Sequence, residues 1–297
     1  MKRIVSLLPS ATDIVGVLGL ETWLVGVSHE CDWPPSVQRL PRLTRSLLGA
    51  NLSPSEIDAL VNQSLHAHRS LYDLDVDRLR QLRPDVILTQ ELCDVCAVSY
   101  DQVLGAARLL HQDGESPSIV SLEPSSLDDV LQTVQIVADE LGEGERGRRV
   151  VAELRQRIAG LRRRGEGLRS KRSVLVLEWT DPPFPGGHWV ADMVEVAGGT
   201  NVPLQEKLRH KPSTRVSWRD VQESDPDVIV VGPCGYDRAR AADAIEQLAS
   251  FPEWQSLRAV QSGRVYPVDA NSFFSRPGPR LIEGIAELQR ILEASER

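Results

Sequence analysis

Two of the chain's four cysteines, Cys93 and Cys96, stand at CxxC spacing in the stretch TQELCDVCAV, residues 89–98, directly behind the apolar run DVILT. A CxxC pair can be half of a zinc site, a redox pair, or two thiols that line a pocket. A redox pair is the least favoured of the three, because the order of the surrounding elements differs from that of thioredoxin-like proteins. The choice between the other two depends on where the fold places these thiols.

Other cysteine and histidine side chains could complete a tetrahedral metal site around the pair. Cys31 and His29 would do so from a neighbouring loop, whereas Cys234 or His188 would do so from the second half of the chain. The thiols could instead line a ligand cleft, either as packing groups or as soft ligands to the metal of a bound chelate. We favour the cleft, and a metal-binding protein with thiolate and histidine ligands for zinc, iron or haem is the alternative.

No catalytic motif marks this sequence as that of an enzyme. It has no nucleophile elbow, no phosphate loop of the GxxxxGK[ST] type and no HExxH zinc motif. The carboxylate pairs Glu30 with Asp32 and Glu91 with Asp94 have no defined partner, so they favour binding or solvation over acid–base chemistry. We therefore expect a binding protein with no obligatory cofactor and with a metal ion as an optional one.

The composition limits the class of protein. The chain has 297 residues and a net charge of −8, which leaves room for two domains and argues against a nucleic-acid partner. An arginine-rich stretch at 145–165 has most of its arginines off the apolar face of a helix, so we interpret it as a solvated helix surface. No stretch approaches the ~20 apolar residues of a membrane span.

The amino-terminal segment MKRIVSLLPSATD bears on location. Its apolar run IVSLL is too short for the apolar region of a signal peptide, and no small-residue cleavage site follows. We therefore expect a cytoplasmic protein whose cysteines are reduced thiols.

The order of elements predicts an α/β fold with two similar halves. The apolar run RIVSLL is followed by a polar turn and a helix, which is typical of an α/β layer. The pattern of short helix, Pro-Asp and buried strand occurs at RPDVIL and again at DPDVIV. We expect an amino-terminal lobe at 1–142, a connecting helix at 143–169 and a carboxy-terminal lobe at 170–297.

Polar and aromatic side chains gather after the predicted strands, where an open α/β sheet binds its ligands. Aromatic side chains at such loop ends favour a flat apolar ligand over a role in the core. The predicted ligand-binding residues are Ser10, Glu30, Trp33, Gln90 and Cys93 in the first lobe, and Trp179, Phe184, His188, Trp189, Tyr236, Phe273, Phe274 and Arg276 in the second.

The chain resembles the helical-backbone class of substrate-binding proteins that serve ABC importers of vitamin B12, iron-siderophores and haem, and within it the vitamin B12-binding branch. The segments that carry the resemblance are RIVSLLPSATDIVGVLG, LRPDVILTQ, DPPFPGGHW, VSWRDVQESDPDVIVV and FFSRPGPRLIEGIAEL, which together cover nearly the whole chain. The resemblance implies two Rossmann-like α/β lobes joined by a single long backbone helix, with the ligand in the cleft between the lobes.

The same resemblance implies a small-molecule metal chelate as ligand, cobalamin or a related corrinoid, and an ABC importer permease as partner. Phe184, the pair Phe273-Phe274 and Arg276 match corrinoid-facing positions of the family. An aromatic residue that flanks the corrin in relatives falls near Gln90, where this chain places its CxxC pair instead. Haem, siderophores and free metal therefore stay open as ligands, and a corrinoid- or tetrapyrrole-processing enzyme is the weakest alternative.

Overall fold

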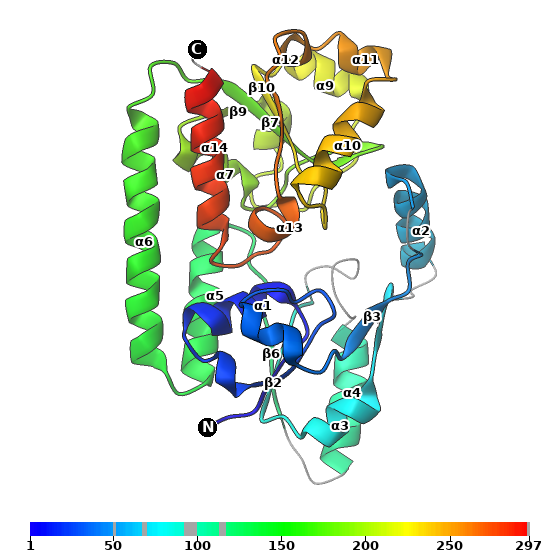
Figure 1. Ribbon diagram of the computed structural model, residues 1–297, viewed down its shortest axis with the longest axis vertical. Coiled ribbons are helices and arrows are strands. Elements are labelled where there is room, and N and C mark those ends of the chain that lie inside the picture. The colour runs from blue at the N-terminus through cyan, green and yellow to red at the C-terminus, as the bar shows by residue number, and fades with distance from the viewer. Residues whose placement is uncertain (50–51, 67–69, 92–99, 113–116, 296–297) are drawn as a thin grey trace. The chain divides into compact units, whose positions relative to one another are not determined.

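The computed structural model describes residues 1–49, 52–66, 70–91, 100–112 and 117–295. These residues group into two compact units (Figure 1). Unit 1 comprises Met1–Glu123 and Gln132–Val151, and unit 2 comprises Pro124–Leu131 and Ala152–Arg297. The expected lobe boundaries at residues 142 and 169 are not tested by this grouping and stay a prediction.

Unit 1 is built on a four-stranded parallel sheet with the order β2-β1-β5-β6. β1 (Ile4–Ser6) lies between β2 (Leu24–Val27) and β5 (Val86–Thr89), and β6 (Ser118–Ser121) pairs with the other edge of β5. Every residue of β1 and β5 is buried, as expected for parallel strands that are covered on both faces. The apolar runs that contain these strands are therefore confirmed as buried strands.

Two parallel strands that are neighbours in a sheet need a crossover connection, which is usually a helix. α1 (Pro9–Val17) does so between β1 and β2, and Pro9 stands at its start, where a missing backbone N–H costs nothing. A separate antiparallel pair, β3 (Thr44–Ser46) with β4 (Tyr72–Leu74), also belongs to unit 1.

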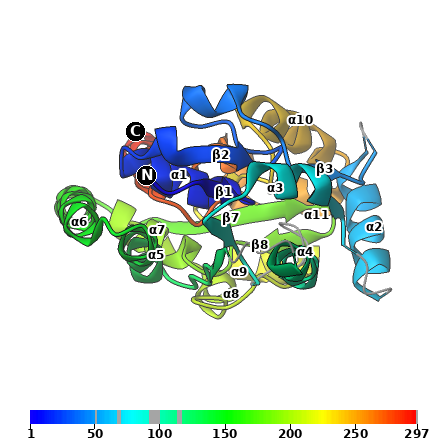
Figure 2. The ribbon, with the colours of Figure 1, turned by 90° about the horizontal axis from the view of Figure 1, so that it is seen from below.

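Unit 2 has a mixed sheet with the order β11-β10-β7-β8. β10 (Val228–Val231) runs parallel to both β7 (Ser173–Thr180) and β11 (Val265–Pro267). β8 (Pro183–Pro185) returns antiparallel beside the end of β7, and β9 (Thr200–Asn201) pairs with its beginning. Figure 2 shows β7 as a long green strand.

The repeated pattern in the sequence has a counterpart in the backbone. α3 (Val76–Leu82) ends at Arg83, whose φ is 43°, directly before a proline and the strand β5. α9 (Trp218–Ser224) ends at Asp225, whose φ is 37°, again directly before a proline and a buried strand. The α/β fold with two similar halves is confirmed, since each unit carries its own parallel strands and crossover helices.

Two helices contribute residues to both units. They are α5 (Leu127–Glu140) and α6 (Gly144–Glu166), and α6 is the long helix that was expected within 143–169. Its 23 residues span about 35 Å at ~1.5 Å per residue. Figure 1 shows it in green, and Figure 2 views it nearly end-on.

The carboxy-terminal helix α14 (Leu281–Ser295) packs on α7 (Val190–Ala197) within unit 2. Among the helices of the described residues, none has both the length and the apolar character that a membrane span requires. The remaining elements are η1 (Glu21–Trp23), η2 (Pro35–Arg39), α2 (Pro54–His66), α4 (Tyr100–Gln112), α8 (Pro203–Glu206), α10 (Arg238–Leu248), α11 (Pro252–Gln255), α12 (Arg258–Gln261) and α13 (Ala270–Phe273).

Candidate functional site

The aromatic side chains predicted in the second half of the chain lie around the carboxyl ends of β7, β10 and β11. Trp179 near the end of β7 pairs across the strands with Phe184 on β8. The ring of Trp179 also meets the ring of Tyr236, which follows β10, with 5.7 Å between centroids in an edge-to-face arrangement. The guanidinium of Arg240 covers the Tyr236 ring at 4.0 Å. Two segments that are distant in sequence, the β7–β8 hairpin and the connection from β10 to α10, therefore meet at one end of the sheet.

Hydrogen bonds tie the loop after β11 to this cluster. The backbone N–H of Asn271 donates to the Tyr236 carbonyl at 3.0 Å. The Asn271 side-chain oxygen accepts from Arg276 Nη2 at 2.9 Å. Beside it, the guanidinium of Arg280 covers the Phe273 ring at 4.8 Å. Two arginines and an aromatic ring thus share one short segment.

Trp189 and His188 join the cluster from the turn before α7. Trp189 is buried, and its indole Nε1 donates to the Phe274 carbonyl at 2.8 Å. The His188 ring stacks on Trp189 at 5.4 Å, and its backbone has a φ of 49°. Burial lowers the pKa of His188, so its imidazole is neutral at pH 7.

Burial divides the predicted residues into two groups. Trp179, Phe184, His188 and Phe273 are partly exposed and are the ones that a ligand can reach. A second group is buried and acts as the frame behind them; its members are Trp189, Tyr236, Phe274 and Arg276. The sequence named these residues but did not predict which of them are buried.

One residue at this edge was missed. Glu178 precedes Trp179 on β7, and its carboxylate accepts a hydrogen bond from the Gly187 N–H at 3.0 Å. Burial raises the pKa of Glu178 to about 7, against the lowering effect of hydrogen bonds from Gly187 and Ser213. Part of the residue is still accessible to solvent, but its carboxyl group lies deep among protein atoms. The available signal was a single acidic residue that interrupts the apolar run SVLVLEW.

In unit 1, the predicted residues that the structure describes follow the carboxyl ends of β1, β2 and β5. Ser10 in the first turn of α1 and Gln90 directly after β5 are both buried, whereas Glu30 is exposed. Trp33 packs on α1, because a Cβ atom at Gly16 would lie only 2.6 Å from the Trp33 ring. The indole of Trp33 is therefore committed at least in part to packing within unit 1.

The predicted metal ligands are only partly described. Cys31 is buried, and its Sγ lies 3.0 Å from Thr12 Oγ1. Cys93 and Cys96 lie outside the described residues. Within the described ranges, no three histidine, cysteine or acidic side chains come together as a metal ion would require. The site formed by Cys31, Cys93, Cys96 and His29 stays a prediction.

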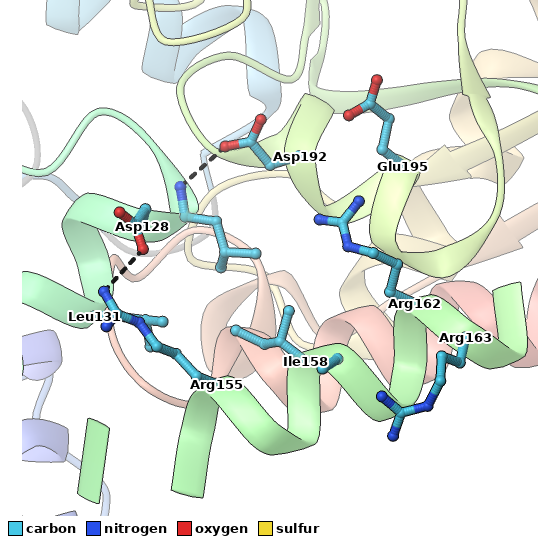
Figure 3. A pocket seen from close by; sticks show the side chains of 10 residues that line it. Asp128, Leu131, Arg155, Ile158, Arg162, Arg163, Asp192 and Glu195 are labelled. Atoms are coloured by element: carbon cyan, nitrogen blue, oxygen red, sulfur yellow. Dashed lines mark hydrogen bonds and ion pairs between the residues drawn. The ribbon is translucent and has the colours of Figure 1, made fainter. Parts of the chain in front are cut away.

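A cavity of about 390 Å³ lies in unit 2, away from all of these residues (Figure 3). Apolar side chains such as Leu131 and Ile158 form part of its wall, and charged side chains of α6 and α7 surround it. The acidic groups have structural partners, since Asp128 pairs with Arg155 at 3.3 Å and Asp192 accepts from the Leu127 N–H at 3.0 Å. Among the predicted ligand-binding residues that the structure describes, none lines this cavity.

Residues 4–271 match the model of the periplasmic binding protein family. A vitamin B12-binding protein of Vibrio cholerae is 23% identical over 300 residues, which cover 100% of this chain and 91% of the relative. An ABC transporter substrate-binding lipoprotein of Bacillus subtilis is 24% identical over 97% of this chain and 78% of the relative. The periplasmic heme-binding protein RhuT from Roseiflexus sp. RS-1 is 22% identical and superposes with a TM-score of 0.73 over 100% of this chain and 99% of RhuT, which shows the fold.

These comparisons correct the expected location. The expectation of a cytoplasmic protein is wrong, because the relatives are a periplasmic protein, a substrate-binding lipoprotein and a vitamin B12-binding protein, which are exported classes. The short apolar run at the amino terminus was a poor guide to location. The match over residues 4–271, together with the two α/β units, shows that the chain belongs to the periplasmic binding protein family.

Proposed function

We propose that this protein is a non-catalytic substrate-binding protein that holds a metal macrocycle of the corrinoid or haem class and delivers it to an ABC importer. The similarity to a vitamin B12-binding protein, to a periplasmic heme-binding protein and to an ABC transporter lipoprotein supports this class of ligand and this partner. The predicted ligand-binding residues are part of this proposal.

The aromatic edge of unit 2 is the observation that carries the proposal. Trp179, Phe184 and Phe273 remain partly exposed in a chain that is only 5% aromatic, and they gather where a parallel sheet places its ligands. A planar macrocycle would bury a large apolar face against these rings. Each aromatic contact would add ~0.5–1.5 kcal/mol beyond the burial of apolar area.

One arginine beside this edge suits the rim of such a ligand. Arg280 is partly exposed and lies over the Phe273 ring, whereas Arg276 is buried in the frame and donates to Asn271. A guanidinium donates to planar acceptors such as carboxylates and amide carbonyls, which are the groups at the edges of haem and of corrinoids.

A binding experiment tests the proposal. Aquacobinamide, cobalamin and ferric haem are each titrated into the purified protein, and the visible spectrum of the ligand and the tryptophan fluorescence are recorded. We expect a spectral shift and quenching at micromolar concentration, without turnover of the ligand. Binding of none of these compounds would refute the proposal, and chemical conversion of one would favour the enzyme.

A double variant tests the aromatic edge itself. Phe184→Ala with Phe273→Ala should weaken binding at least tenfold, because ~1.4 kcal/mol corresponds to one decade of affinity. Trp23→Ala is the matched control, since this partly exposed aromatic lies before β2, at the opposite end of a strand from the ligand-binding edge. Equal weakening in both variants would contradict the assignment. Binding of zinc alone, lost in Cys31→Ser, would favour the thiolate metal site instead.

A further inference from the structure

The end of α6 and the turn that follows it carry a concentrated positive charge. Residues 162–172, which we call the basic segment, hold six basic side chains and one acidic one, in a chain whose net charge is −8. All of these residues belong to unit 2, so the surface lies within one compact unit. The basic side chains are Arg162, Arg163, Arg164, Arg169, Lys171 and Arg172.

The arginines of α6 differ in whether a carboxylate neutralises them. Earlier in the helix, Arg148 pairs with Glu145 at 2.6 Å and Arg157 pairs with Glu283 at 2.8 Å. In the basic segment, by contrast, four exposed side chains form no ion pair with any residue that the structure describes. They are Arg162, Arg163, Arg169 and Lys171.

The helix dipole explains only part of this charge. Cations are favourable in the last turn of a helix, where Arg163 and Arg164 stand. The effect falls off within that turn, so it does not account for Arg169 and Lys171, which come after the helix has ended. The basic segment therefore keeps positive charge that an anion from outside the molecule can neutralise.

The backbone beneath these cations is held on two sides. Gln289 of α14 is buried; it donates to the Leu161 carbonyl at 2.9 Å and accepts from Arg164 Nε at 3.1 Å. On the side of α7, a Cβ atom at Gly165 would lie only 2.7 Å from the Gly198 nitrogen. The end of α6 is thus packed closely between neighbours, and a partner would find the charges on an ordered frame.

The cavity in unit 2 adds an apolar element next to the charges. Arg162 and Arg163 border this cavity, and Leu131 and Ile158 form part of its wall (Figure 3). A surface with cations beside an apolar hollow matches a phospholipid, which carries a phosphate next to its acyl chains. A soluble polyanion such as a nucleic acid would use only the charges.

The exposed apolar residues favour a lipid surface over a protein partner. Protein interfaces usually have an apolar or aromatic centre that is depleted of charge. Among the described residues, the exposed large apolar side chains all belong to unit 1. They are Met1, Leu47, Leu60, Leu109 and Ile136. The basic segment therefore offers charge without the exposed anchor that a protein partner would need.

We propose that the basic segment is a docking surface for a lipid bilayer with anionic phospholipid headgroups. Each arginine or lysine close to such a surface strengthens binding by about fivefold at low salt. The rest of the chain is acidic, so an anionic bilayer attracts the protein through this segment and repels its other surfaces. The proposal goes beyond the binding of a macrocycle and holds for any ligand of the protein.

Sedimentation with lipid vesicles tests the proposal. We expect the full chain to bind vesicles that contain phosphatidylglycerol, to leave vesicles of pure phosphatidylcholine unbound, and to lose binding at about 0.5 M salt, where the charges are screened. A triple variant that removes three of the unpaired charges should bind about a hundredfold more weakly. Its substitutions are Arg162→Gln, Arg163→Gln and Arg169→Gln.

A second triple variant is the matched control, because it changes the net charge equally but removes exposed arginines that each have a carboxylate partner. Its substitutions are Arg45→Gln, Arg148→Gln and Arg219→Gln. We expect it to bind anionic vesicles nearly as the wild type does. Urea unfolding checks that both variants fold, and the single variant Lys171→Gln should weaken binding by about fivefold.

Three results would overturn the proposal: no binding of the wild type to anionic vesicles, equal weakening in the two triple variants, or binding of soluble polyphosphate that matches vesicle binding in strength and depends on the same three arginines. The last result would assign the segment to a soluble polyanion instead. Macrocycle titration of the first triple variant should match the wild type, so failure of this proposal leaves the proposed function standing.

Discussion

Replacement of Glu178 by glutamine should change the pH dependence of stability in a defined direction. In the folded protein, burial raises the pKa of Glu178 from its ordinary 4.5 to about 7. Between pH 4.5 and about pH 7, Glu178 holds a proton in the folded state that it has released in the unfolded state. The unfolded state binds fewer protons there, so the free energy of unfolding falls as the pH rises from 4.5 to 7, and the loss is complete above pH 7.

The size of the effect follows from the same pKa. At ~1.36 kcal/mol per pKa unit, a rise from 4.5 to about 7 corresponds to about 3 kcal/mol. Glutamine keeps an oxygen that can accept from the Gly187 N–H, but it has no charge to bury. Relative to wild type, Glu178→Gln should therefore gain up to ~3 kcal/mol between pH 5 and pH 8.

Urea unfolding at pH 5, 6, 7 and 8 measures this difference, with the tryptophan fluorescence of the protein as the signal. At each pH, the free energy of unfolding of the variant is subtracted from that of the wild type. This removes the contributions of other groups with shifted pKa values, such as His188 and Glu287. Glu246→Gln, at an exposed position on α10, is the matched control and should leave the pH profile unchanged. A difference that stays constant from pH 5 to pH 8 would refute the reasoning.

Two glycines lie in opposite surroundings. Gly187→Ala should weaken macrocycle binding, because the new Cβ would lie 2.6 Å from the Ser213 backbone nitrogen. In Gly160→Ala the new Cβ would meet nothing within 4 Å, so this variant of α6 should raise the free energy of unfolding by roughly 0.5–1 kcal/mol. Urea unfolding and macrocycle titration of both variants check these two expectations. Gln205→Ala should cost about 1–3 kcal/mol in a urea titration, because the buried Gln205 oxygen accepts from the Val176 N–H at 2.7 Å. A cost below ~0.5 kcal/mol would contradict that assignment.

Local rules explain why so much of the fold was predictable. A short, near-continuous apolar run directly after Pro-Asp is typical of a buried strand of a parallel sheet, and β5 and β10 are both such strands. Residues a few positions apart also determine where the helices before these strands end and form the capping box of Ser217 with Asp220. Location was mispredicted, since a short apolar segment carries little information about export.

The candidate site also has features that the sequence determines and features that only the folded structure determines. The sequence by itself determined that aromatic residues follow the strands of unit 2, because the position of a loop after a strand is a local property. Only the tertiary structure decided that Trp179 and Phe184 are reachable while Trp189 and Phe274 are frame, since burial depends on every neighbouring segment.

The pKa of Glu178 and the hydrogen bonds of His29 depend still more on the fold. Gly187 and Ser213 approach Glu178 from other loops, and Thr44 approaches His29 from a strand 15 residues away. Electrostatics and hydrogen bonding act over a few ångströms of space, whatever the distance along the chain. The sequence could name the titratable groups, but only the folded chain brings them the partners that set their chemistry.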